Sequence, residues 1–215
     1  MIDPLDNATV DIEVFTGDII EEAEVNEELT GKRDFGGSTT PKDIRDLWAT
    51  PQWLFDYFNE IYKFDLDAAA NDINHKCDNY LTLENDGTVE EHEWICESAV
   101  WCNPPYSDPQ PWIEKAINES SLGVLSVMLL PCDPSTEWFH LASKSASKIY
   151  ILTGGRVQFV RADTGEEQRG NPKGSVLFVF DPNDGDQETI YLPIWEAGGK
   201  EPRWFKSWTL KEEEE

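Results

Sequence analysis

The stretch Ser98-Ala-Val-Trp-Cys-Asn-Pro-Pro-Tyr106 decides the fold of this chain. Residues 98–102 are small, β-branched or apolar, and such a run predicts a buried strand. Pro104 and Pro105 have no backbone N–H group to donate to a sheet ladder, so the strand must end before them. We therefore expect a rigid turn at the end of a central strand.

This turn presents groups that suit a planar amine. Asn103 precedes a proline, which favours an extended backbone, and Pro104 restricts the direction of the carbonyl that follows. One side-chain amide oxygen and one backbone carbonyl can then accept both hydrogens of a single NH2 group, which favours the pyramidal nitrogen that attacks an electrophile. Tyr106 offers a flat ring for stacking. The turn therefore suits the amine of adenine or cytosine, although Asn and Pro are also ordinary turn formers.

Further motifs flank the turn. In chain order, the motifs are Trp48-Ala-Thr-Pro51, Phe64-Asp-Leu-Asp-Ala-Ala-Ala70, Asn85-Asp-Gly87, Val100-Trp-Cys-Asn-Pro-Pro-Tyr106 and Gly155-Arg-Val-Gln-Phe159. Together they resemble the phage-type DNA N6-adenine methyltransferase (Dam-like) family, over about Leu47 to Asp181. The resemblance implies an enzyme that transfers a methyl group from S-adenosylmethionine to a flipped adenine in double-stranded DNA. The catalytic residues that it implies are Asn103, Pro104, Pro105 and Tyr106.

The predicted strands and helices alternate along the chain. Helical spacing of apolar residues predicts helices over 51–61, 109–117 and 136–145. Apolar runs predict strands over 80–83, 123–130, 148–152 and 174–180, and residues 64–70 predict a first core strand that breaks into a turn of small residues. Pro131 is expected to end the run 123–130, which is typical of a central parallel strand. We predict an α/β fold, an abbreviated Rossmann-like class I methyltransferase sheet that is mostly parallel with an antiparallel strand near the C-terminal end.

Two segments supply candidate residues for the methionine part of the cofactor. Thr50 is a good N-cap with Pro51 at the first helical position, and the resemblance places Thr50 beside the methionine part. Asp67 and Ala68 stand at the carboxyl end of the first core strand, where doubly wound sheets bind nucleosides. The resemblance puts this pair nearest the amino-acid part, although the usual Gly-x-Gly is absent.

Two acidic residues are candidates for the nucleoside part. Glu84 ends the next predicted strand, where an acidic side chain can bind ribose hydroxyls. The resemblance suggests that Asp86 lies near the cofactor adenine. The sequence Asn85-Asp86-Gly87 is also a strong turn signal, which alone would account for Asp86.

The net charge of −26 is unusual for a protein that binds DNA. Residues 1–30 hold ten acidic and no basic residues, and residues 211–215 are one Lys and four Glu. The two ends therefore carry half of the net charge. The acidic excess fits either a salt-rich environment or a tail that competes with DNA for a basic surface.

The longest net-positive stretch, residues 144–173, holds six basic and three acidic residues. In the resembled family, Gly-Arg-x-x-Phe lies on the substrate side, so we nominate the loop 153–173 as the DNA-contacting element. The alternative is a solvated charged face. Trp138 either belongs to the core or lines the pocket of the flipped base. The candidate substrate-binding residues are Trp138, Arg156, Arg161, Arg169 and Lys173.

The length of 215 residues suits one well-buried core. We expect a disordered acidic leader over 1–40, a catalytic domain over 41–183 and a C-terminal extension with an acidic tail over 184–215. No run approaches a membrane span of about 18 apolar residues, and the start lacks the features of a signal peptide, which points to the cytoplasm. The spacing of the four cysteines predicts buried thiols and no metal site.

Two other functions stay open at this point. The same turn suits methylation of another planar amine, on cytosine N4, RNA or a protein glutamine. The charge instead suits a non-catalytic DNA mimic or interaction module. The recognition sequence and the oligomeric state cannot be predicted from these residues.

Overall fold

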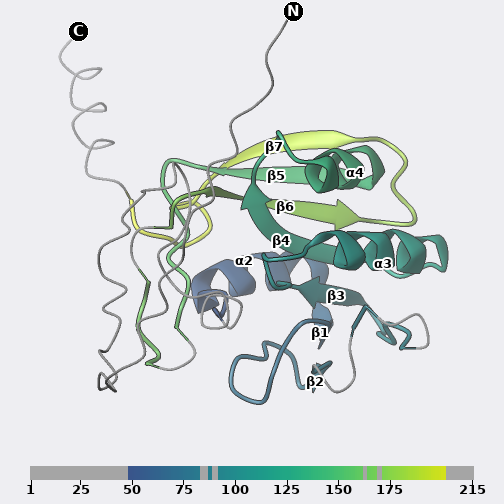
Figure 1. Ribbon diagram of the computed structural model, residues 1–215, viewed down its shortest axis with the longest axis horizontal. Helices are drawn as coiled ribbons and strands as arrows, with labels where there is room; N and C mark the ends of the chain where they lie inside the picture. Colours follow the sequence, from purple (N-terminus) through teal and green to yellow (C-terminus); the bar gives the residue numbers. More distant parts are fainter. Residues whose placement is uncertain (1–47, 83–86, 89–91, 162–163, 169–170, 202–215) are drawn as a thin grey trace, which may run out of the picture. The chain divides into compact units, whose positions relative to one another are not determined.

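The structure is a computed structural model, shown in Figure 1. It describes residues 48–82, 87–88, 92–161, 164–168 and 171–201. Contacts divide the chain into two units, Met1–Asp34 and Phe35–Glu215, and every described residue belongs to the second unit. The predictions made for Glu84, Asp86 and Arg169, for the leader and for the end of the chain after 201 lie outside the described residues.

A seven-stranded sheet forms the centre of the second unit (Figure 1). Its strands are β1 (Phe64–Asp67), β2 (Asn79–Tyr80), β3 (Ala99–Cys102), β4 (Ser126–Cys132), β5 (Lys148–Thr153), β6 (Gly174–Phe180) and β7 (Glu188–Pro193). They lie in the order β2-β1-β3-β4-β6-β5-β7, and only β6 runs antiparallel to its neighbours, β4 and β5. The predicted α/β fold is confirmed. Because the other six strands run in one direction, their carboxyl ends meet at one edge of the sheet.

The predicted central strand is β3, whose four residues are all buried. It pairs in parallel with β1 on one side and β4 on the other, with Trp101 opposite Asp67 and Val127. Trp101 packs edge-on against Phe55, with ring centroids 5.5 Å apart. Burial of apolar side chains on both faces of a strand, about 25 cal/mol for each Å² of apolar surface, fixes its position in the sheet.

Within the described ranges, three helices cover the two faces of the sheet (Figure 1). They are α2 (Gln52–Tyr62), α3 (Gln110–Ser121) and α4 (Glu137–Ser145). The buried side chains of α2, including Phe58, belong to the same core cluster as Trp101. The buried apolar side chains of α3 and α4, Ile113 and Ala142 among them, belong to a second cluster with Val100. The sheet therefore lies between α2 on one face and α3 with α4 on the other.

Three local predictions were wrong. The N-cap of α2 is Pro51 rather than Thr50, whose hydroxyl has no hydrogen-bond partner in the described ranges. Pro131 lies inside β4 and does not end it. The last β4 residue that pairs with β3 is Met128, and proline is tolerated where a strand has a neighbour on one side only. The helix predicted over 136–145 begins one residue later, because Thr136 is its N-cap and its hydroxyl accepts from the Phe139 backbone N–H group.

The chain after β6 returns to the sheet. β7 pairs in parallel with β5 over six residues, and Leu192, Ile194 and Ala197 are buried in the cluster that includes Trp101. Residues 188–197 thus add one strand and part of the core. Among the helices of the described ranges, none is long and apolar enough to cross a membrane.

Candidate active site

The turn at Asn103 leaves β3 at the edge where the carboxyl ends of the parallel strands meet. The Asn103 side-chain nitrogen donates a hydrogen bond to the Trp48 backbone carbonyl, 3.2 Å away. The side-chain oxygen Oδ1 is buried and accepts no hydrogen bond from the described part of the chain. Leaving a buried polar atom unpaired costs about 1–3 kcal/mol. The amide is therefore fixed through its nitrogen, and its oxygen is available to a ligand.

Three more polar side-chain atoms, two on the segment 48–50 and one in the turn, are buried and have no partner among the described residues. They are Trp48 Nε1, Thr50 Oγ1 and Tyr106 Oη. The Phe159 ring joins two of these residues, because its centroid lies 6.4 Å from that of Trp48 and 5.8 Å from that of Tyr106. Burial raises the pKa of Tyr106, so its phenol keeps its proton at neutral pH. The turn, together with the segment 48–50 that accepts its hydrogen bond, therefore combines one acceptor with three donors that no described residue pairs.

Asp67 organises the loop that follows β1. Its side chain is 3% exposed, and its carboxylate oxygens accept from the backbone N–H groups of Ala69 at 3.3 Å and Lys76 at 3.0 Å. Burial raises the pKa of Asp67 to about 6, although these hydrogen bonds act in the opposite direction. Ala68 is buried beside it and donates its backbone N–H to the Trp101 carbonyl. Asp67 and Ala68 thus hold the loop against β3.

Gly87 brings a second segment to the same place. A Cβ atom at this position would lie 2.4 Å from the Ala68 carbonyl oxygen and 2.9 Å from the Trp112 ring. The Gly87 carbonyl accepts a hydrogen bond from the buried Trp94 indole at 2.9 Å. Only glycine permits this approach. The end of the predicted turn 85–87 is therefore held against the carboxyl end of β1.

The predicted DNA-binding residues differ in their surroundings. Arg156 is exposed and donates to the Pro172 carbonyl at 2.5 Å. Lys173 forms an ion pair with Asp133 at 2.6 Å, which lowers the pKa of that carboxyl group. Arg161 is half-buried, and its backbone N–H donates to the Glu166 carbonyl at 2.9 Å.

Trp138 lies on α4, half-buried, and packs against the core cluster of Val100. Its ring centroid is 5.9 Å from that of Phe139. Cys77 and Cys102 are buried, Cys96 and Cys132 are half-buried, and all four thiols are free. Within the described ranges, no three His, Cys, Asp or Glu side chains are grouped so that they could hold a metal ion.

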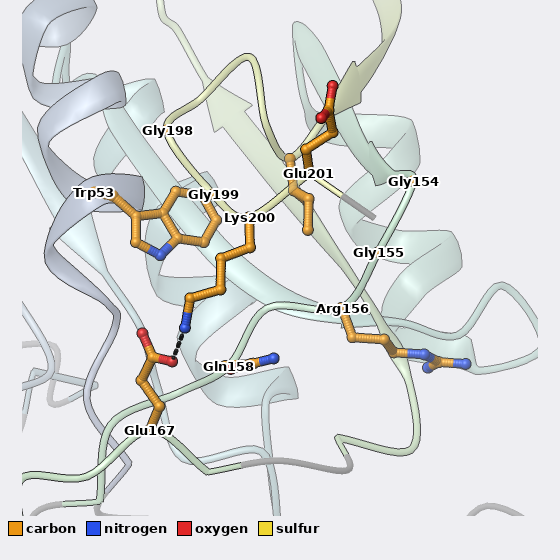
Figure 2. Close-up of a pocket in the computed structure, with 11 residues that line it drawn as sticks. Trp53, Gly154, Gly155, Arg156, Gln158, Glu167, Gly198, Gly199, Lys200 and Glu201 are labelled. Carbon is orange, nitrogen blue, oxygen red and sulfur yellow. Dashed lines mark hydrogen bonds and ion pairs between the residues drawn. The ribbon is translucent and has the colours of Figure 1, made fainter. Parts of the chain in front are cut away.

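Sequence reasoning missed a pocket of about 360 Å³, shown in Figure 2. It opens where β5 and β7 end, and its lining includes the glycines that follow each of these strands, with Trp53 and Gln158. Part of the lining belongs to the loop 153–173 predicted to contact DNA, but Arg156 was its only individually nominated residue. The signal was present as two Gly-Gly pairs, Gly154-Gly155 and Gly198-Gly199, each a few residues or less after a strand.

Comparisons with known proteins point to one family. The family described as "DNA N-6-adenine-methyltransferase (Dam)" matches residues 37–194. The chain is 39% identical over 169 residues to the DNA N-6-adenine-methyltransferase of Haemophilus phage HP1, covering 76% of this chain and 95% of that protein. It is 36% identical over 184 residues to the DNA N-6-adenine-methyltransferase of Escherichia phage T1, covering 78% and 76%.

Proposed function

The chain belongs to the DNA N-6-adenine-methyltransferase (Dam) family and so methylates the N6 amine of adenine in DNA, and we propose that the adenine is flipped onto the turn Asn103-Pro-Pro-Tyr106. A paired base presents its amine to its partner strand, so an enzyme must take the base out of the stack. We expect the reaction to occur in the cytoplasm of a host cell, since the two relatives are phage enzymes.

The observation that carries this proposal is the unused Oδ1 atom of Asn103. The hydrogen bond from its side-chain nitrogen to Trp48 fixes the amide orientation before any ligand arrives. With the Pro104 backbone carbonyl as a second acceptor, the two N–H bonds of an adenine amine are held while the nitrogen lone pair stays free. Positioning of this kind accounts for much of the acceleration in reactions that need no strong base.

Tyr106 and its neighbours offset the cost of extruding the base. Extrusion costs a few kcal/mol, and stacking of one base on an aromatic ring contributes about 1–3 kcal/mol. The Tyr106 ring is held edge-on by Phe159, so it is pre-oriented for the flipped base. The unpartnered Trp48 and Thr50 donors lie on the segment that accepts the Asn103 hydrogen bond.

S-adenosylmethionine suits the other side of the turn. We assign Thr50, Pro51, Asp67 and Ala68 to its methionine part, with the free Thr50 hydroxyl and the close approach of Gly87 to Ala68 in support. Glu84 and Asp86 directly precede the Gly87 approach in the chain, and we assign them to its nucleoside part. When bound, this cofactor supplies an electrophilic methyl group on a sulfonium centre.

We assign the phosphate contacts to the loop 153–173. Arg156 and Lys173 are both exposed, and Lys173 is paired with one carboxylate that a phosphate can replace. Arg161 and Arg169 complete the basic set, and we keep Trp138 as a candidate at the rim of the base pocket. Charge contacts to phosphates fix the position of DNA without reading its sequence.

The test is Asn103→Ala. We expect methyl transfer to DNA to be lost while S-adenosylmethionine still binds in calorimetry, because the substitution removes an acceptor for the amine only. Asn118→Ala, at an exposed position on α3, is the matched control and keeps full activity. The methylated nucleoside is identified after digestion of the DNA. An Asn103→Ala enzyme that still forms N6-methyladenine at the normal rate refutes the proposed role of the turn.

A further inference from the structure

The pocket in Figure 2 lies at the same sheet edge as the Asn103 turn. Gly154 and Gly155 follow β5 directly, and Ile194 follows β7. Both strands run parallel to β3, whose carboxyl end carries Asn103. With a volume of about 360 Å³, the pocket has the size of small ligand sites in proteins. Apart from the phosphate contact assigned to Arg156, no role has been assigned to its lining residues.

One extended segment separates the pocket from the Asn103 turn. In residues 156–160 the side chains alternate, as they do along a strand. Val157 and Phe159 are buried in the core cluster against which Tyr106 packs. Arg156 and Gln158 instead line the pocket. The segment is fixed in place, because Val160 exchanges two backbone hydrogen bonds with Ala49, at 2.8 and 2.9 Å. Val157 and Phe159 thus face the core beside Tyr106, whereas Arg156 and Gln158 face the pocket.

The lining offers the groups that bind a nucleobase. The half-buried Trp53 indole borders the pocket, and Gly199 passes so close to it that a Cβ atom there would lie 3.1 Å from the ring. Aromatic faces of this kind stack with bases. The Gln158 amide also borders the pocket, and no hydrogen bond joins it to any other residue that the structure describes. Glutamine pairs with adenine through N6 and N7.

The pocket also has basic groups at its rim. Arg156 and Trp53 lie on opposite sides of it in Figure 2. Lys200 forms an ion pair with Glu167 at 2.6 Å, and the two side chains are 75% and 43% exposed. An ion pair this exposed contributes little to stability, so Lys200 is free to turn to a phosphate.

From this arrangement we infer that the pocket binds a second nucleotide of the DNA, next to the target adenine, with its base on Trp53 and its edge at Gln158. The inference rests on the proposed flipping of the target. Extrusion of the target leaves its neighbour stacked on one side only, which lowers the cost of moving that neighbour. The pocket thereby contributes to the choice of methylation site, which the Asn103 turn cannot provide because it contacts only the target base.

The first experiment tests whether the contribution of Trp53 to activity depends on one particular base next to the target. The methylated site is located by sequencing modified DNA, and duplexes with that site carry one abasic residue at each flanking position in turn. Stacking worth about 1–3 kcal/mol predicts that Trp53→Leu lowers kcat/KM by about 5- to 150-fold on intact DNA. On the duplex that lacks the pocketed base, the same substitution has almost no effect. Equal losses on every duplex overturn the inference.

Two controls separate this result from a folding defect. Trp53→Phe keeps a stacking ring and restores most of the activity on intact DNA. S-adenosylmethionine binding and the thermal unfolding midpoint of Trp53→Leu must match those of the normal enzyme, since the coupling is read only from folded protein. If Trp53→Leu does not fold, the comparison is made with Trp53→Phe and Trp53→Tyr, whose rings differ in stacking area, against the same abasic series.

The second experiment tests the reading of the base edge. Gln158→Ala is expected to relax the base preference at the same flanking position by about 5- to 150-fold, as loss of a bidentate contact does. Gln110→Ala, exposed on α3, leaves the preference unchanged. An unaltered preference at every position in Gln158→Ala overturns the inference. Failure of the flipping proposal has a different signature, because it is shown by an active Asn103→Ala enzyme. The Trp53 and Gln158 variants leave Asn103 intact and so do not bear on that result.

Discussion

At Tyr106, the ring and the hydroxyl group have different surroundings. The ring contacts Phe159 edge-on, whereas the hydroxyl is buried with no hydrogen-bond partner in the part of the chain that the structure describes. A tyrosine kept only for packing would satisfy its hydroxyl or expose it to water. The ring and the hydroxyl therefore make separable contributions to function and to stability.

We expect Tyr106→Phe to be mild and Tyr106→Ala to be severe. Phenylalanine keeps the stacking ring and removes an unpaired hydroxyl, so the thermal unfolding midpoint should stay or rise. Alanine loses the stack with the base, about 1–3 kcal/mol, or about 5- to 150-fold in kcat/KM on DNA. Steady-state kinetics on duplex DNA measure both. A phenylalanine variant as damaged as the alanine variant would show that the hydroxyl is the important group.

Asp67 is expected to make stability depend on pH. Its folded pKa of about 6 lies above the ordinary value of 3.8, so between these values the folded chain holds a proton that the unfolded chain has lost. Stability from this group therefore falls as pH rises through that window. Asp67→Asn removes the effect.

The measurement is urea unfolding of both proteins at about pH 5 and about pH 7, above the isoelectric point of about 4.2. Since one pKa unit corresponds to about 1.4 kcal/mol, the free energy of unfolding of the normal protein minus that of Asp67→Asn should fall by about 1 kcal/mol over this range. The other carboxylates contribute equally to both proteins and cancel. A difference that rises with pH would contradict the assigned burial.

At the scale of the elements, the close contact between Gly87 and the loop after β1 shapes the proposed S-adenosylmethionine site. Gly87→Ala would place a methyl group 2.4 Å from the Ala68 carbonyl oxygen, so one of the two segments must move. We expect S-adenosylmethionine to bind about tenfold more weakly or worse in calorimetry, and the protein to lose about 1–3 kcal/mol of stability. Gly185→Ala is the matched control, since nothing lies within 4 Å of its Cβ position. Unchanged affinity in Gly87→Ala would remove this segment from the cofactor side.

Elements with local signals could be predicted from the sequence. The strand predicted over 174–180 has the same bounds as β6, and the helix predicted over 51–61 differs from α2 by one residue at each end. In both, the apolar period reports burial directly. β7 gave no such signal, because it is an edge strand with only Leu192 buried. Its place beside β5 is a long-range pairing that local sequence does not encode.

The same limit explains which site residues could be predicted. Asn103 was nominated because the chemistry of the turn is local. The hydrogen bond from Asn103 to Trp48 joins residues 55 positions apart, and the pocket at Trp53 forms only where the loops after β5 and β7 meet. The Thr50 hydroxyl was predicted as a helix cap, but it has no hydrogen-bond partner among the residues that the structure describes.

On the scale of the whole molecule, direction within the sheet brings the functional parts together. The loop after β1, the turn after β3 and the pocket after β5 all lie at carboxyl ends of strands that run in one direction. One edge of the sheet therefore faces both the proposed cofactor and the DNA. A chain with net charge −26 is repelled by DNA, which is itself a polyanion. Binding at this edge therefore depends on where along the chain the negative charges lie.

Deleting residues 1–30 is expected to tighten DNA binding. The deletion removes ten carboxylates and no basic side chain. Repulsion between exposed charges extends over about 30 Å at 0.01 M salt and about 10 Å at 0.1 M, so the KM for DNA should fall severalfold at the lower salt and change little at the higher. A full-length chain whose ten leader acids are replaced by their amides separates charge from chain length and should behave like the deletion. If the amide variant keeps the normal KM at low salt while the deletion lowers it, the leader acts by occupying space; if neither changes KM, the leader does not oppose DNA at all.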